Sequence, residues 1–498
     1  MDGLNTVIIP GINSIEEYLN ELEKSCDGFI NKRASIRLAK ESFSMLQELE
    51  EWGINFPKDE KGEYYQGRKG KYHVTMKSPN IKPLLASQVR SKKIQVLQHT
   101  MATNLLRHKE TVIGCTALDN RLGDFIICRA KSTILAAGGC GRFSLPPSGY
   151  LFGTFDCPSN TGDAYSMAYH AGAELTGFEF IYGGYVRTKD YNSPIKDICV
   201  SHGGKVVNSL GNEVLPRNQT FLGQRVSEED MRVDIRKGLD PLFIDIRKVS
   251  KENMKSIREL MFTTERGTLK TFFRGRGVDV RKDLIEIAQG DYHLCGGHGG
   301  TGIIINEETE TTLKGLYAVG DSSWVTRQWL TGAFVFGAIA GKNAAQYASS
   351  IKEHEITSDS VEKEKARVFA PLYVHDGLKP AQLEYKLRRI INEYIISPKN
   401  KMKLKIALQW VQRFKKNDVQ ELKASDAHEL GRVLEIQSIL NCVEMAARAS
   451  LERTESRWSF LHQRTDFPEK DDENWQKQII IKKNMKTGKM ALAIRRFT

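Results

Sequence analysis

The stretch that decides the fold is Gly315-Leu-Tyr-Ala-Val-Gly-Asp321, followed shortly by Thr331-Gly-Ala-Phe-Val-Phe-Gly-Ala-Ile-Ala-Gly341. An apolar strand runs into a Gly-Asp turn, and a short loop then leads to a helix that begins with small residues. This order places a backbone turn, one carboxylate and the positive end of a helix together. Such a place suits a cofactor that carries a ribityl chain and a pyrophosphate.

Two further glycine-centred motifs precede this stretch. One is Ala136-Ala137-Gly138-Gly139, which follows an apolar strand, and the other is Thr161-Gly162-Asp163, which opens a helix expected over 162–173. Alone, each motif also has an ordinary structural reading as a tight turn or a helix cap. In this order and spacing, the three motifs resemble the FAD-dependent oxidoreductase family of fumarate reductase and succinate dehydrogenase flavoprotein subunits, L-aspartate oxidase and adenylylsulfate reductase alpha subunits.

The resemblance implies an α/β fold with FAD as the cofactor. We expect a discontinuous Rossmann-like FAD-binding domain over 1–180 and 293–352, an inserted α+β capping domain over 181–292 and a helical C-terminal domain over 353–498. The resemblance also assigns twelve residues to cofactor binding: Gly3, Leu4, Ala136, Ala137, Gly138, Thr161, Gly162, Asp163, Gly320, Asp321, Thr331 and Gly332.

One expected part of the flavin site is missing from the sequence. Such flavoproteins normally begin with a strand, a G-x-G-x-x-G turn and a helix, and no such motif precedes Ala136. We therefore interpret the sequence as N-terminally truncated. Because the pyrophosphate would lack its principal helix N-terminus, we expect this chain alone to bind FAD weakly or not at all.

Two clusters are candidates for substrate chemistry. A glycine-rich loop, Asp291–Gly302, carries His293 and His298, and the resemblance makes either histidine a substrate-binding residue. Arg247, in Phe243-Ile-Asp-Ile-Arg247, resembles the proton-donating arginine of fumarate reductases, although a guanidinium has a very high pKa and equally serves to clamp an anion. Arg225 or Arg232 is a looser match to the anion-binding arginine of adenylylsulfate reductases.

The sequence departs from the fumarate reductases at one informative point. Those enzymes carry Phe-His-Pro-Thr-Gly where the inserted domain starts, whereas this chain has Phe178-Glu-Phe-Ile-Tyr-Gly. The favoured reading is therefore a flavoprotein subunit resembling adenylylsulfate reductase alpha, with His298, Arg247 and Arg225 binding the anion. Two alternatives stay open: a fumarate reductase or succinate dehydrogenase-like flavoprotein that uses Arg247 and His293, and an inactive fragment or scaffold subunit without bound FAD.

Composition narrows the expected binding partners and the expected cellular compartment. The eight cysteines show no C-x-x-C spacing, so no metal or iron–sulfur site is expected within the chain, and electrons would come from an iron–sulfur, ferredoxin-like subunit. The net charge of +12 suits an anionic substrate or an acidic partner, and no nucleic-acid-binding motif accompanies it. With no signal peptide and no long apolar run, we expect a cytoplasmic protein without direct membrane insertion.

Periodicity predicts the remaining elements. Helices are expected over 14–51, with Ser14 as a cap, and strands over 93–99, 111–117 and 123–128. In the insert we expect a strand at 242–246 and helical stretches near 251–262 and 281–288. Helices should follow from about 360 to Leu451, and the tail from Arg453 is expected to be irregular.

Overall fold

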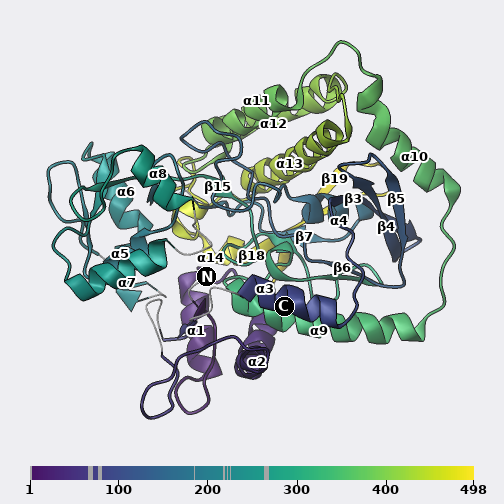
Figure 1. Ribbon diagram of the computed structural model, residues 1–498. Coiled ribbons are helices and arrows are strands. Elements are labelled where there is room, and N and C mark those ends of the chain that lie inside the picture. The colour runs from purple at the N-terminus through teal and green to yellow at the C-terminus, as the bar shows by residue number, and fades with distance from the viewer. Residues whose placement is uncertain are drawn as a thin grey trace.

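The computed structural model describes residues 3–65, 71–76, 81–183, 186–216, 219–220, 223–224, 226–262 and 268–497 (Figure 1). Segments on both sides of the insert meet in one parallel pair, β6 (Thr133–Leu135) with β17 (Leu316–Ala318). Each strand runs into a left-handed glycine, Gly138 (φ +74) and Gly320 (φ +57), a conformation that costs glycine little. The predicted α/β fold is confirmed.

The helices of this part follow their sequence signals. The Ser14 side chain accepts the Glu17 N–H at 3.1 Å and starts the first of two predicted helices. The helix predicted over 162–173 is bounded by left-handed Gly162 and Gly172. The helices here are α1 (Ile15–Ser25), α2 (Lys32–Glu51), α3 (Ile81–Ser91), α4 (Asp163–Ala171) and α9 (Trp329–Ser350), with a 3-10 turn over Gly320–Ser322.

A three-stranded antiparallel sheet precedes β6 in the chain. It has the order β3 (Thr100–His108), β4 (Thr111–Asp119), β5 (Phe125–Arg129). The strand predicted over 93–99 is wrong, because left-handed residues Lys93 and His99 bound that run. Its apolar side chains, including Ile94 and Val96, are exposed, and the strand begins only at Thr100.

The insert has its own hydrophobic core and sheet. The sheet order is β10 (Lys205–Val207), β13 (Leu242–Asp245), β14 (Ile285–Gln289), β9 (Val186–Thr188). Helices α5 (Lys196–Val200), α6 (Glu228–Arg236), α7 (Lys251–Met261) and α8 (Leu269–Gly275) complete this lobe, at the left of Figure 1. A separate apolar cluster around Ile244 and Ile285 fills it. The helix predicted near 281–288 is wrong, since Ile285 and Ile287 alternate into this core as strand residues.

The C-terminal part is helical, as predicted, but the tail is not irregular throughout. Its helices are α10 (Ser358–Phe369), α11 (Pro380–Ile390), α12 (Lys401–Arg413), α13 (Ala427–Glu452) and the short α14 (Asp472–Trp475). The tail forms a hairpin of β18 (Lys477–Lys483) and β19 (Met490–Arg496), which extends a sheet with β7 (Leu175–Thr176) and β16 (Gly302–Ile303). Ile479–Ile481 are buried there, and the many lysines around them hid the strand pattern.

The remaining strand pairs are short. They are β1 (Gly3–Leu4) with β2 (Val74–Thr75), β11 (Gln219–Thr220) with β12 (Gly223–Gln224), and β8 (Tyr182–Gly183) with β15 (Tyr292–His293). Among the helices that the structure describes, none is long and apolar enough to cross a membrane. The domain boundaries given above stay predictions.

A buried ion network fixes the C-terminal helices on the flavin domain. Glu384 of α11 is fully buried and accepts hydrogen bonds from Arg142, Arg388 and Arg432, each at 2.9 Å. Arg142 belongs to the glycine motif that follows β6, and Arg432 lies on α13. One carboxylate therefore ties three segments that are far apart in the sequence.

Removing that carboxylate is expected to destabilise the whole fold. Glu384→Gln leaves Arg388 beside an uncharged amide and leaves Arg142 and Arg432 to share Glu435, at a cost of about 3–5 kcal/mol. Urea unfolding followed by circular dichroism measures this. The matched control is Glu393→Gln, whose exposed pair with Arg389 is worth less than about 1 kcal/mol. Equal losses in the two variants would contradict the assignment of Glu384.

Candidate functional site

Backbone bridges bring the sequence motifs together around Cys140. The Cys140 N–H donates to Leu294 O at 2.7 Å, and the Leu294 N–H donates back to Cys140 O at 3.1 Å. An isolated bridge also joins Cys140 to Thr161. The Gly138 turn, the Thr161-Gly162 turn and the histidine loop are thus adjacent, although they are far apart in the chain.

The same loop is bound to the Gly-Asp turn. The Gly296 N–H donates to Asp321 O at 3.0 Å, and the Trp329 N–H donates to Gly297 O at 3.1 Å. A Cβ added at Gly297 would overlap Asp321 Oδ1, so only glycine allows this approach. The histidine loop therefore lies directly against the turn formed by Gly320 and Asp321.

Both predicted histidines lie where the insert joins the flavin domain. Strand β8 leads into the insert and pairs with β15, which leads out of it, with Tyr182 opposite His293. The Tyr182 ring is near both histidines, with its centroid 5.3 Å from the His293 ring and 5.8 Å from the His298 ring. The structure thus brings His293 and His298 together.

Asp156 completes this pair and was not predicted from the sequence. Its Oδ2 lies 3.8 Å from His293 Nε2. Burial raises the pKa of the Asp156 carboxyl, and the nearby Asp321 acts in the same direction. It sits in an unpatterned loop, so no spacing in the sequence pointed to it.

Burial keeps both imidazoles neutral. It lowers the pKa of His293 to about 4, and the Arg187 charge also lowers it. Burial likewise lowers the pKa of His298, against the opposing charges of Asp321 and Asp156. Among the described residues, neither ring nitrogen of His293 has a hydrogen-bond partner. A neutral, unsatisfied imidazole in this position is suited to bind a polar ligand.

Arg187 supplies a positive charge that acts on Asp156, His293 and His298. It lies on β9, and its guanidinium is 3.9 Å from the centroid of the Phe155 ring. The Phe155 ring lies 6.3 Å from the His293 ring by centroid, and the Arg187 charge acts to lower the pKa of Asp156, His293 and His298. In the sequence it is only one cation in an aromatic and basic run, with no pattern that singles it out. We name Asp156, Arg187, His293 and His298 the junction cluster.

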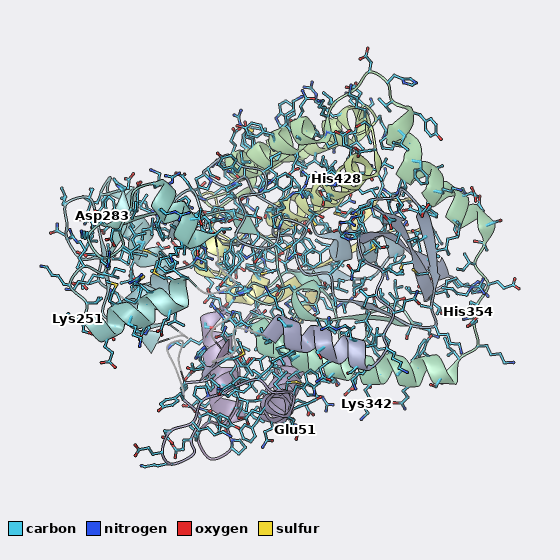
Figure 2. The ribbon with its side chains drawn as sticks, in the orientation of Figure 1. Glu51, Lys251, Asp283, Lys342, His354 and His428 are labelled. Carbon is cyan, nitrogen blue, oxygen red and sulfur yellow. The ribbon has the colours of Figure 1, made fainter. Side chains whose placement is uncertain are left out.

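The other predicted arginines have different positions. Arg247 is half-exposed and forms a bidentate pair with Asp245. The Asp283 charge also acts on it, and Figure 2 shows Asp283 at the outer part of the insert lobe. The structure does not bring Arg247 to the histidines. Arg232 donates to Tyr292 Oη at 3.2 Å, beside His293, whereas Arg225 lies outside the described residues.

Some of the cofactor-binding residues predicted from the sequence have surroundings that suit a flavin. Gly3 and Leu4 form β1, and just beyond them the Thr6 N–H donates to Thr331 Oγ1 at 3.2 Å, beside Gly332. The buried acceptors Asn5 Oδ1 and Gln328 Oε1, and His298 Nδ1, have no hydrogen-bond partner within the described ranges. Unsatisfied polar atoms around a Gly-Asp turn suit a ligand with several donors and acceptors, as a flavin ring is.

Asp163 has a different environment from the other cofactor candidates. It accepts from Thr161 Oγ1 at 2.8 Å. Burial raises the pKa of Asp163 to about 6, and Ser438 of α13 partly counters this as a hydrogen-bond donor. Gly162 packs against Cys140 and Cys442. These contacts join α4 to α13, whereas Ala136 and Ala137 lead directly into the Gly138 turn.

A possible metal-ligand set also occurs at this place. The ligand atoms of Cys295, His298 and Asp321 lie within 4.8 Å of one another. Burial raises the pKa of the Cys295 thiol well above its usual value, which disfavours the thiolate that a metal requires. We therefore assign no metal to this set, and His298 stays in the junction cluster.

This arrangement of a parallel pair, two glycine turns and a small-residue helix defines a flavin-dependent oxidoreductase. Residues 2–329 match the family described as FAD binding domain, and residues 384–498 match the fumarate reductase flavoprotein C-terminal family. The chain therefore belongs to the FAD-dependent oxidoreductase family of fumarate reductase and succinate dehydrogenase flavoproteins, with FAD as its cofactor.

Individual relatives agree with this assignment. The chain is 26% identical to an uncharacterized FAD-dependent oxidoreductase of Methanocaldococcus jannaschii over 96% of this chain and 88% of the relative. It is 27% identical to one subunit of the fumarate reductase (CoM/CoB) of Methanothermobacter marburgensis over 92% of this chain and 84% of the relative. The structure of Archaeoglobus fulgidus adenylylsulfate reductase is similar with a TM-score of 0.90 and 23% identity, covering 100% of this chain and 88% of that one; at this identity the likeness shows the fold.

His293 should make the protein sensitive to acid. Its native pKa of about 4 lies below the ordinary 6.5, so the unfolded chain binds more protons between these values, and stability falls as the pH drops through that window. His293→Gln should reduce the loss between pH 7 and pH 4 by on the order of 3 kcal/mol. Urea titrations at several pH values measure it.

The control for this prediction is His428→Gln, at the exposed start of α13 (Figure 2). It makes the same chemical change without removing a buried imidazole. If both variants follow the pH profile of the wild type, His293 is not held neutral by burial.

The contact between Gly297 and Asp321 should matter for the cofactor. Gly297→Ala forces the Asp321 carboxylate away from the Gly-Asp turn, and a displacement costing about 1–3 kcal/mol weakens FAD binding on the order of tenfold. Quenching of FAD fluorescence during titration measures the affinity. Gly337→Ala on α9 is the control, since its added Cβ meets no atom within 4 Å, and an equal loss there would contradict the prediction.

Proposed function

We propose that this protein is the flavoprotein subunit of a reductase resembling adenylylsulfate reductase, which acts on an anionic substrate. The observation that carries the proposal is the junction cluster, in which the buried His293 and the partly buried His298 lie with one arginine and one carboxyl beside the Gly-Asp turn. The partial burial of Arg187 strengthens its attraction to an anion.

The packing at the start of the insert favours this reading over the fumarate alternative. At the point where fumarate reductases carry a substrate-binding histidine, Glu179 is fully buried and paired with Arg453 at 2.9 Å. The Glu179 carboxylate therefore holds the C-terminal tail, through Arg453, against the start of the insert. Arg247, the proton donor required by the alternative, lies outside the cluster.

The residues of the cluster have distinct roles in the proposed chemistry. When bound, the flavin supplies two-electron chemistry, and the Gly138 turn, Asp321 and Thr331 would hold it. Arg187 neutralises the substrate anion. His293 and His298 hydrogen-bond its oxygens as neutral rings, and Asp156, with its raised pKa, is placed to deliver a proton as the leaving group departs.

The electrons are proposed to come from an iron–sulfur, ferredoxin-like partner. The chain has no C-x-x-C spacing of its own, and its net charge of +12 favours association with an acidic protein.

A substrate assay tests the proposal. The protein with excess FAD and reduced methyl viologen is offered adenylylsulfate or fumarate, and viologen oxidation is followed. We expect turnover with adenylylsulfate only, and Arg187→Gln should lower kcat/KM on the order of 100-fold through the lost anion contact. Lys342→Gln, far along α9 (Figure 2), is the control and should be unchanged.

The other outcomes are equally informative. Turnover with fumarate alone would establish the dicarboxylate alternative. A protein that binds FAD but turns over neither compound would favour the scaffold reading, and unchanged kinetics in Arg187→Gln would remove the junction cluster from the site.

A further inference from the structure

Two cysteines outside the junction cluster are directly opposite each other in the three-stranded sheet. Cys115 of β4 is in register with Cys128 of β5. Both are free and half-buried. The Cys128 thiol lies close enough to raise the pKa of Cys115, in addition to the effect of burial. Their separation in the sequence gives no sign of this pairing.

The backbone spacing permits a covalent link. The Ala130 N–H donates to Ile113 O at 3.0 Å and the Asp119 N–H donates to Asp124 O at 2.9 Å. Cys115 and Cys128 therefore occupy a hydrogen-bonded pair position, where Cα atoms are about 5.5 Å apart. That Cα distance lies inside the range of roughly 4.4–6.8 Å found in disulfides, but the Cβ atoms of such a pair are up to about 5.5 Å apart and must approach to roughly 3.5–4.5 Å.

The position of strand β5 allows Cys128 to move toward Cys115 until the two sulfur atoms can bond. In the sheet order β3-β4-β5, strand β5 pairs with a neighbour on one side. Its residues are partly to fully exposed, so it can shift toward β4 at little cost in packing. From β5 the chain leads directly into β6 and the Gly138 turn of the flavin site.

We propose that Cys115 and Cys128 form an oxidation site, which hydrogen peroxide converts reversibly into a disulfide between β4 and β5. Because burial and the neighbouring Cys128 raise the pKa of Cys115 to about 11, which disfavours its thiolate, Cys128 is the thiol oxidised to a sulfenic acid as peroxide is reduced to water. The second sulfur then displaces the hydroxyl group, so the S–S bond forms and a second water leaves. The two sulfurs lose two electrons and the peroxide gains both. This site is independent of the proposed substrate.

The protein contains a natural comparison pair. Cys140 and Cys442 are also adjacent, since the thiol of Cys140 raises the pKa of Cys442 and a Cβ at Gly162 would touch both sulfurs. Both are fully buried. In both pairs the two thiols are close together. Of the two pairs, only Cys115 and Cys128 are exposed enough for peroxide to reach them.

Peroxide treatment of the full chain tests the site. Cys157→Ser removes the exposed thiol and serves as the background. After stoichiometric peroxide, alkylation and trypsin digestion, we expect a linked peptide pair carrying Cys115 and Cys128, which is resolvable because trypsin cleaves after Arg121 between them. The thiol titre should fall by about two per chain and recover with dithiothreitol.

Two further measurements decide the result. In Cys115→Ser on the same background, Cys128 should end as a sulfenic acid that dimedone captures, with no linked peptide. Absence of the linked peptide, under peroxide that fully oxidises Cys157 in the wild type, would overturn the proposal. So would oxidation of Cys140 and Cys442 at the same rate, because reactivity would then reflect opening of the whole protein.

Discussion

Burial of charged side chains is the constraint on which the rest of this structure depends. Glu384 and Glu179 are both fully buried, and each is neutralised by arginines from distant segments. Because an unpaired buried charge costs several kcal/mol, each pair accepts essentially one arrangement of its partners. Through Arg142 and Arg453, the C-terminal helices and tail are held against the flavin domain and the start of the insert.

This constraint also explains the shape of the tail. Arg453 donates to Glu179 and Glu455, and Arg457 pairs with Glu455 and Asp472. Lys399 is buried beside them and donates to Glu179 O at 2.7 Å; burial lowers the pKa of Lys399 to about 7. With its charges satisfied in this way, the tail can return through the molecule as β18 and pair with β7.

The junction cluster arises from close backbone contact. Glycines at 138, 297 and 320 let three loops approach until Cys140 and Leu294 exchange backbone hydrogen bonds and the Gly296 N–H donates to Asp321 O. The two imidazoles then meet because β8 and β15 pair in register. A change of one residue in that register would turn His293 to the opposite face, so the site depends on the insert beginning and ending at one place.

The sequence by itself determined the flavin family, the helices with clear caps, and the histidine loop, because glycine turns and capping side chains act locally. It misplaced the strand at 93–99, read β14 as helix and missed the tail hairpin, where burial and pairing with distant strands outweigh local pattern. Only the tertiary structure decided that Asp156 and Arg187 join the histidines, that Arg247 does not, and that Cys115 faces Cys128. These outcomes depend on contacts between distant segments, and no spacing along the chain encodes them.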